Sequence, residues 1–153
     1  VPYAKGVEYC IWRGARLLTE AEWEFAARGN LDHSMYPWGG VYLRNRLGCF
    51  VANFKPMRGN YIDDGALATE RVATFSANEY GLYDMAGNVS EWVDACWNTG
   101  QPVGDASRQC DRVLKGGSWK SGAFALRPKS RQRAPAGYKS YTTGFRVVRE
   151  LVD

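Results

Sequence analysis

The chain has 153 residues, which corresponds to a single domain large enough to bury a sizeable core. Hydrophobic residues make up 45% and charged residues 24%, but 6 Trp, 9 Tyr and 17 Gly favour turn-rich structure packed by large rings. A net charge of +4 does not demand a nucleic-acid partner, and none is expected. No apolar run approaches the roughly 18 residues of a membrane-spanning helix.

Two short helices are predicted near the amino terminus. Apolar residues recur at helical spacing within residues 1–13, and Gly14 would end that helix. The second helix covers residues 20–28, because Thr19 and Glu22 form a capping box and a glycine follows where a C-cap belongs.

The rest of the chain is predicted to consist of short strands and loops. Strands are expected at residues 72–75 and 143–151, and residues 112–119, RVLKGGSW, are expected to be a strand that enters a glycine turn. Residues 41–67 show neither the helical nor the strand period of apolar residues and are expected to be loop. An extended segment over residues 127–133 would place four cations on one face. These cations are Arg127, Lys129, Arg131 and Arg133.

The stretch YGLYDMAGNVSEWVDACW, residues 80–97, mixes apolar bulk with the polar side chains of Asp84, Asn88 and Glu91. An ionised group taken out of water is very costly without a partner. The partners are either backbone N–H groups in tight turns or calcium, which binds carboxylate, amide and carbonyl oxygens together.

The four cysteines lack the CxxC spacing of metal sites. Cys96 and Cys110 flank a loop rich in Gly, Pro and Asn, and would form a disulfide in an oxidising compartment. This disulfide would close a loop of about 15 residues and contribute on the order of 3 kcal/mol. For Cys10 and Cys49, two buried free thiols are an equally open alternative to a bridge.

Six blocks of sequence, in order along nearly the whole chain, resemble the formylglycine-generating-enzyme or sulfatase-modifying-factor family. They are RLLTEAEWEFAARG, YPWGG, ANF, YGLYDMAGNVSEW, RVLKGGSW and TGFRVV. The resemblance implies an α+β fold, an irregular variant of the C-type lectin fold with two short helices, short antiparallel strands and much loop. It also implies a single FGE-sulfatase-like domain over residues 1–153 that lacks the family's amino-terminal part.

Family resemblance does not fix the chemistry, because function depends on the residues of the site. In the oxidising members, two cysteines after the GGS turn bind copper and activate oxygen. Here the segment SWKSGAFALRPKSRQRAP contains no cysteine, and Ala125 and Ser130 align with the two positions. Neither side chain supplies the soft thiolate that Cu(I) needs. No copper, no catalytic residue and no enzymatic activity are therefore expected.

The resemblance also implies two structural calcium sites made of side-chain and carbonyl oxygens. The first would use the side chains of Asn53 and Asp64 and the carbonyls of Phe54 and Ala66. The second would use the side chains of Asp84 and Glu91 and the carbonyls of Gly87 and Val89. An ion bound only by the native state would stabilise it by mass action.

A narrower resemblance comes from the block GCFVANFKPMRGNYIDDG, followed by YGLYDMAGNVSEW and GGSWK. This combination is similar to the outer-membrane ring lipoproteins of Bacteroidetes gliding motility and type IX secretion. It implies a non-catalytic interaction domain in an oligomeric ring, with a periplasmic ring subunit as its protein partner. The domain would lie at the periplasmic face of the outer membrane or in the periplasm, and would meet the membrane only through a lipid anchor outside this chain.

The predicted partner surface includes the four cations of residues 127–133, with solvated charges, or an Arg133 paired to a carboxylate, as the alternative. Two other functions stay open. One is a formylglycine-generating or related sulfur-oxidising enzyme with an unfamiliar site. The other is a lectin-like domain that displays ligands, in the manner of variable proteins with Asn-rich tails. Residues 121–143 contain no Asn, which counts against the second.

Overall fold

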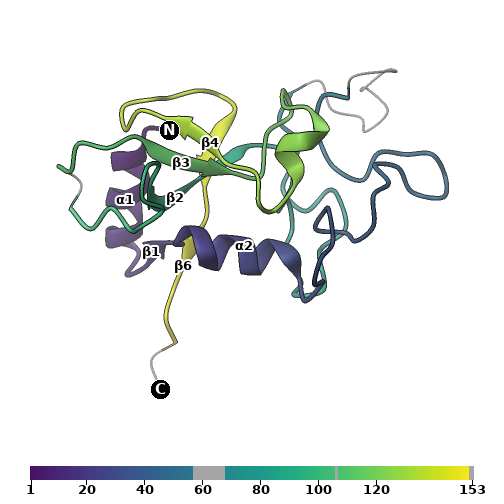
Figure 1. Ribbon diagram of the computed structural model, residues 1–153, viewed down its shortest axis with the longest axis horizontal. Helices are drawn as coiled ribbons and strands as arrows, with labels where there is room; N and C mark the ends of the chain where they lie inside the picture. Colours follow the sequence, from purple (N-terminus) through teal and green to yellow (C-terminus); the bar gives the residue numbers. More distant parts are fainter. Residues whose placement is uncertain (57–67, 106, 152–153) are drawn as a thin grey trace.

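The computed structural model describes residues 1–56, 68–105 and 107–151 (Figure 1). These residues form two α-helices, one 3-10 helix and six short strands, connected by loops. In chain order they are α1 (Tyr3–Trp12), β1 (Arg16–Leu17), α2 (Glu20–Arg28), β2 (Ser90–Cys96), β3 (Arg112–Lys115), η2 (Ala123–Leu126), β4 (Gln132–Ala134), β5 (Thr143–Phe145) and β6 (Val147–Val148). No helix among the described residues is long and apolar enough to cross a membrane.

Both predicted helices are present. α2 begins at the predicted capping box, in which the Thr19 side chain accepts from the Glu22 amide (3.2 Å) and the Glu22 carboxylate accepts from the Thr19 amide (2.9 Å). Gly29 ends α2 with a left-handed φ of 56°, a conformation that glycine adopts without a steric cost. α1 ends at Trp12, and Gly14 follows it in the left-handed region.

The main sheet has four strands in the order β4-β3-β2-β5. β2 pairs antiparallel with β3, and β3 with β4, but β2 and β5 run parallel. The prediction of antiparallel strands is therefore wrong for this pair. The chain passes through β3, β4 and a loop before it reaches the free edge of β2, and a long connection of this kind permits a parallel pair.

The predicted strand over residues 143–151 is broken into two. β5 lies beside β2, whereas β6 pairs antiparallel with β1 in a separate two-stranded sheet. Arg146 stands between β5 and β6, and its side chain reaches β2. Because of this break, one short segment pairs with strands of both sheets, and the Arg146 side chain is directed toward β2.

Two other predicted extended segments differ from the structure. Residues 72–75 form turns, in which Val72 is 81% exposed and Ala73 has a left-handed φ of 63°. No strand among the described residues pairs with this segment, so Val72 and Thr74 have no sheet to join. The strand that was predicted to enter a glycine turn within residues 112–119 is confirmed: β3 ends at Lys115, and Gly116 and Gly117 follow in the left-handed region. In residues 127–133, the first three form a turn and only Gln132 and Arg133 belong to a strand, β4.

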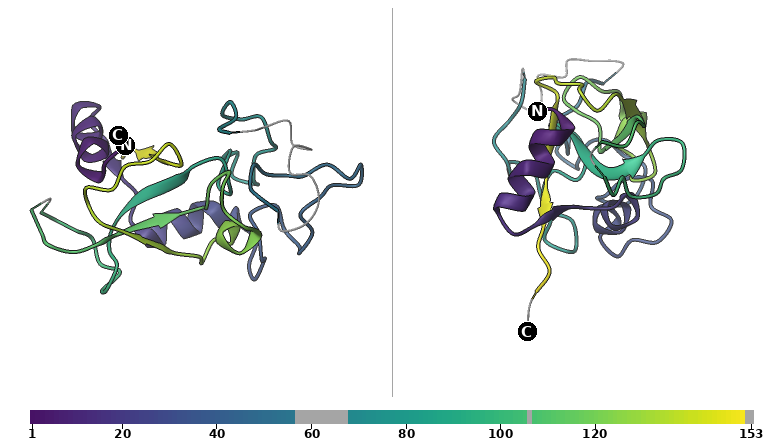
Figure 2. Two further views of the ribbon diagram at one scale, coloured as in Figure 1. Left: turned by 90° about the horizontal axis from the view of Figure 1, so that it is seen from above. Right: turned by 90° about the vertical axis from the view of Figure 1, so that its left-hand side faces the viewer.

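α1 and α2 pack on opposite faces of the main sheet (Figures 1 and 2). Side chains of α1 share a buried cluster with Trp92 and Leu114. Side chains of α2 share another with Val93 and Val113, each adjacent in its strand to a residue of the first cluster. Successive strand residues point to opposite faces, which explains the two clusters. A third cluster, around Phe54 and other side chains, supports the loops.

Candidate functional site

An ion pair between buried Glu91 and half-buried Arg146 lies where the second calcium site is predicted. Glu91 in β2 is only 5% exposed. Its carboxylate accepts two bonds from the Arg146 guanidinium, Nε to Oε2 (2.6 Å) and Nη2 to Oε1 (2.7 Å), and one from the Trp23 indole N–H (2.8 Å). Bidentate pairs of this kind are strong. Burial lowers the pKa of Arg146, but the charge and hydrogen bond of Glu91 outweigh it, so this pKa is raised.

Asp84, another predicted ligand, is held in the turn before β2. Its φ of 54° is left-handed, and its Oδ2 accepts a bond from the backbone N–H of Ala73 at 2.9 Å. Arg146 Nη2 also donates to the carbonyls of Tyr83 (3.0 Å) and Asp84 (3.3 Å). The guanidinium therefore joins this turn to β2, as a cation coordinated by oxygen atoms would.

Calcium fits this second set of donors only in part. Arg146 already neutralises Glu91, and three N–H donors fill most of the lone pairs of the carboxylate. Within the described residues there is no group of three or more His, Cys, Asp or Glu side chains that could hold a metal. The backbone bond to Asp84 agrees with the alternative of tight turns. Calcium bound by Asp84, Gly87, Val89 and Glu91 stays a prediction.

The first predicted calcium site lies partly outside the described residues. Asp64 and Ala66 fall in the part that the structure does not describe. Asn53 and Phe54 are both buried, and the Asn53 side-chain nitrogen donates to the carbonyl of Ala68 at 2.8 Å. This site also stays a prediction.

The cysteines do not form a pair of thiols. Cys96 and Cys110 are joined in a disulfide with Cα atoms 5.7 Å apart, as the flanked loop predicted. Cys10 and Cys49 are both free thiols, which agrees with the open alternative. Cys10 is buried, but Cys49 is exposed and lies in residues 44–49, which all face solvent.

The two positions aligned with the family's copper cysteines lie near η2. Ala125 is part of this helix, and its Cβ would stand 3.1 Å from a Cβ placed on Gly117, so η2 packs closely on the glycine turn. Ser130 follows η2, and its hydroxyl donates to the carbonyl of Phe124 at 2.5 Å. A methyl group and a hydroxyl that is already bonded offer no soft ligand for copper.

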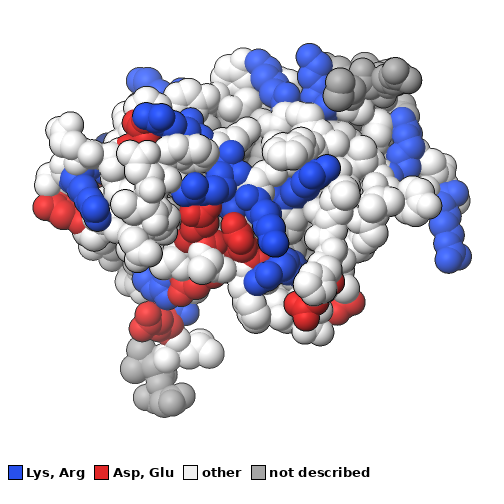
Figure 3. All heavy atoms as spheres, in the orientation of Figure 1, with Lys and Arg blue, Asp and Glu red and all other residues white. Residues whose placement is uncertain are grey.

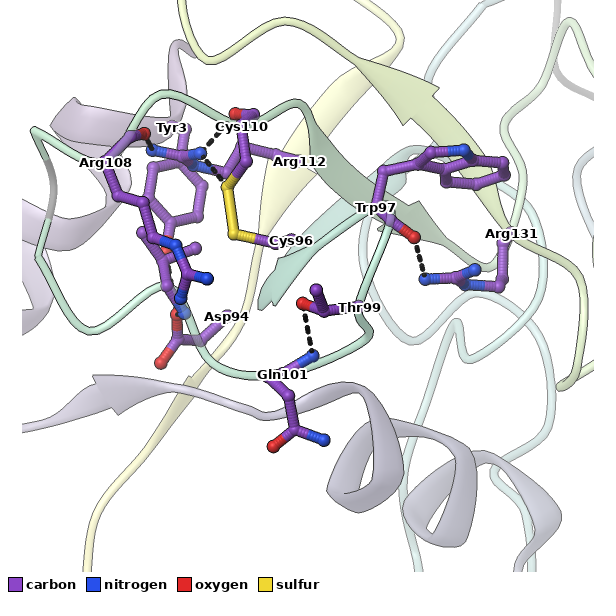
Figure 4. The surroundings of a disulfide bond; sticks show 11 residues. Tyr3, Asp94, Cys96, Trp97, Thr99, Gln101, Arg108, Cys110, Arg112 and Arg131 are labelled. Atoms are coloured by element: carbon purple, nitrogen blue, oxygen red, sulfur yellow. Dashed lines mark hydrogen bonds between the residues drawn. A yellow bond between two sulfur atoms is a disulfide. The ribbon is translucent and has the colours of Figure 1, made fainter.

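The disulfide fastens the end of the loop between its two cysteines to β2, and Tyr3 of α1 lies close by (Figure 4). Buried Arg112 donates to the carbonyl of Cys110 and lies 4.9 Å over the ring of Tyr3. Asp94 accepts from the Tyr3 hydroxyl (3.0 Å) and from the amide of Val103 (2.8 Å). Burial and the charge of Asp94 raise the pKa of Tyr3. The disulfide is thus part of a connected polar network.

The four cations of the predicted partner surface do not form one face, because the turn at residues 127–129 breaks their alternation. Arg131 pairs with Glu20 of α2 at 2.5 Å, and Arg133 pairs with Asp111 at 2.5 Å. Figure 3 shows basic and acidic side chains interleaved between β3, β4 and α2. A partner role for Arg127, Lys129, Arg131 and Arg133 stays a prediction.

The sequence did not identify three cations as structural residues: Arg112 and Lys115, which are buried, and Arg146, which is half-buried. The Lys115 side chain is 0% exposed, and its Nζ lies 2.7 Å from Glu24 and 3.6 Å from Glu20. The sequence offers one sign of such a residue, the lysine in the strand RVLK, because a cation in a buried strand needs a partner. That partner comes from another element, so spacing along the chain does not reveal it.

A family model described as the sulfatase-modifying factor enzyme 1-like domain, FGE-sulfatase, matches residues 1–151. The inactive C-alpha-formylglycine-generating enzyme 2 of Mus musculus is 46% identical over 112 residues, 72% of this chain and 33% of that protein. The formylglycine-generating enzyme of Mus musculus is 38% identical over 159 residues, 95% of this chain and 42% of that protein. The structure of PvdO from Pseudomonas aeruginosa is 30% identical, with a TM-score of 0.77 over 99% of this chain and 60% of that chain. The chain thus spans less than half the length of the two curated relatives.

Proposed function

Because the chain belongs to the FGE-sulfatase family, we propose that it is a non-catalytic member whose role is to bind another protein. The position of its cysteines is the observation that supports this proposal most. Two of the four are joined in the disulfide, one is buried and one lies on an exposed loop. Copper chemistry of the family's kind needs soft thiolate ligands, and the segment after the GGS turn has none.

Two relatives, one named as inactive and one named as an enzyme, bear on this proposal. The inactive formylglycine-generating enzyme 2 is 46% identical, which agrees with a domain without catalysis. The formylglycine-generating enzyme is 38% identical over 95% of this chain. Its name favours the alternative, a formylglycine-generating or related sulfur-oxidising enzyme, which would then need a site other than a cysteine pair in the segment after the GGS turn.

Oxygen consumption separates the two functions. The purified chain is incubated with copper and a cysteine-bearing sulfatase peptide in an oxygen electrode, beside an active formylglycine-generating enzyme. We expect the chain to consume no more oxygen than copper and peptide alone. Repeated turnover above that background would overturn the proposal and support the enzyme.

A finer part of the proposal is that the domain belongs to an outer-membrane ring lipoprotein of type IX secretion or gliding motility. It rests on the block GCFVANFKPMRGNYIDDG, much of which lies outside the described residues. The relatives named above are not secretion proteins by name. The disulfide agrees with a compartment outside the reducing cytosol, such as the periplasm, but does not specify one.

The full-length reading frame tests this finer assignment. A lipoprotein signal with its acylated cysteine, and co-purification with a periplasmic ring subunit, are the expected results. A fused kinase, sulfatase or histidine-rich domain would contradict it. The lectin-like alternative predicts an Asn-rich, ligand-binding tail over residues 121–143. The lack of Asn in these residues counts against it.

A further inference from the structure

A groove of about 390 Å³ opens between the sheet, the turn after β3 and the loop before β5. Its lining includes Ser90, Ser118, Lys120, Ser121, Arg133 and Tyr138, and its described lining residues include no Asp or Glu. We propose that this groove binds an acidic segment of a protein partner. The inference rests on the proposed function, since it names the chemistry of the partner.

The base of the groove offers a hydroxyl proton. Ser118 is buried, and its Oγ lies 3.2 Å from Ser121 Oγ, so one of these two hydroxyls donates to the other. Backbone N–H groups of Ser118 and Lys120 also donate to this pair, at 3.0 and 3.3 Å. A hydroxyl has one proton and two acceptor lone pairs. The pair therefore keeps one hydroxyl proton for a ligand oxygen, while the mutual bond and the two backbone donors occupy most of its lone pairs.

Two cations supply the attraction for a carboxylate. Lys120 is exposed, and its Nζ donates to the Tyr141 hydroxyl and lies 5.0 Å from the Trp119 ring and 4.6 Å from the Tyr141 ring. An ammonium has three N–H donors. The bond to Tyr141 holds Lys120 in place, and the other N–H groups of its ammonium can donate to a ligand. Arg133 uses Nε for Asp111, and the structure assigns its other guanidinium donors no bond with the described residues.

Exposed rings around the groove suit a polypeptide. Tyr138 of the lining is 40% exposed, and Tyr141, whose hydroxyl accepts from Lys120, is 69% exposed. Aromatic residues and arginine are enriched at protein interfaces, where rings supply contact area and polar tips supply hydrogen bonds. Complementary charge would fix the orientation of the partner. Carboxylates of the partner would meet Lys120 and Arg133, and its apolar groups would lie on the rings.

An acidic protein suits this surface better than a single-stranded nucleic acid, although rings and cations also bind nucleic acids. Asp111 partly neutralises Arg133, which weakens the continuous positive track that a phosphate backbone needs. The disulfide is also typical of compartments outside the cytosol. Both observations favour a protein partner.

Fluorescence anisotropy with a fluorescein-labelled hexaglutamate peptide tests the inference. The oxidised chain should bind hexaglutamate and not hexaglutamine. Lys120→Glu should weaken binding about tenfold or more. The matched control is Arg46→Glu, an equal change of charge on an exposed loop residue outside the groove lining, which should change binding less than about twofold. Circular dichroism of both variants checks that each is folded.

Three results would overturn the inference. They are no binding of hexaglutamate by the unsubstituted chain, equal losses in the two variants, and tighter binding of a labelled oligouridylate that depends on Lys120. The oxygen-electrode assay reports separately on the proposed lack of catalysis. A chain that is inactive but does not bind the peptide would refute the acidic groove alone.

Discussion

Glu91 depends on contacts from two other elements. Its carboxylate receives N–H groups from Trp23 of α2 and from Arg146, the residue that separates β5 from β6. The sequence identified Glu91 as a polar group in an apolar stretch, but assigned it to calcium or backbone groups. The actual partner was not predicted because it lies 55 residues along the chain.

Glu91→Gln should destabilise the domain by about 2 kcal/mol or more, because it removes the counter-charge of the half-buried Arg146 guanidinium and weakens its hydrogen bonds. The free energy of unfolding in urea measures the change. Glu8→Gln is the control, since Glu8 pairs with Lys5 on the surface at 61% exposure. Such exposed pairs contribute about 1 kcal/mol or less. Equal effects of the two substitutions would contradict the role of Glu91.

Glu22 makes the stability depend on pH. Hydrogen bonds from Arg16 and from the Thr19 amide lower the pKa of Glu22 from 4.5 to about 2. Since the folded pKa is depressed, the ionised carboxylate stabilises the fold above pH 4.5, and this contribution is lost as the pH falls toward 2.

Glu22→Gln should therefore cost about 1 kcal/mol at pH 7, the usual size for a cap and an exposed ion pair. Urea unfolding of both proteins at a series of pH values measures the difference. We expect the difference to shrink between pH 4.5 and 2. A difference that stays constant over this range would show that the charge of Glu22 does not stabilise α2.

Elements with local signals were predicted well, and those that depend on distant partners were not. The capping box and Gly29 define α2 within its own sequence. In contrast, residues 72–75 carry a strand-like composition but pair with no strand in the described part of the chain. The parallel pairing of β2 with β5 follows from the path of the chain between them. The FGE-like fold with two helices, short strands and much loop is confirmed by the family match and the likeness to PvdO.

The turn before β2 should not tolerate a side chain at Gly87. Gly87 has a φ of 80°, and a Cβ there would lie 2.3 Å from the carbonyl oxygen of Asn53. Gly87→Ala therefore combines a left-handed backbone with a clash against backbone, and should cost more than about 2 kcal/mol.

Gly81→Ala is the matched control, because Gly81 has a φ of 75° but nothing within 4 Å of the added atom. It should cost only the conformational part, about 1–2 kcal/mol. Thermal and urea unfolding measure both. If Gly81→Ala destabilises as much as Gly87→Ala, the close approach to Asn53 does not limit this position.

For the whole molecule, the sequence predicted the family and the lack of cysteines in the segment after the GGS turn. It could not predict how the remaining polar groups combine, because the groups that meet come from distant segments. Lys115, for example, meets two glutamates of α2. The four cations of residues 127–133 were expected on one face, but two of them pair with separate carboxylates.

The calcium prediction also concerns the whole domain. Calcium bound by the native state alone should raise the melting temperature, and EGTA should lower it. Asp84→Ala should reduce this calcium-dependent shift if the second site is occupied. No effect of EGTA would contradict both predicted sites, and a shift unchanged by Asp84→Ala would contradict the second.

The lack of a copper centre is the central claim, and a Cu(I) titration tests it most directly. The chain competes with a chromogenic Cu(I) chelator, alongside Cys49→Ser, which removes the exposed thiol. We predict that neither protein withdraws copper from the chelator, because no two thiolates meet in the described structure and residues 119–136 have no cysteine. One equivalent of Cu(I) held tightly by Cys49→Ser would contradict this account.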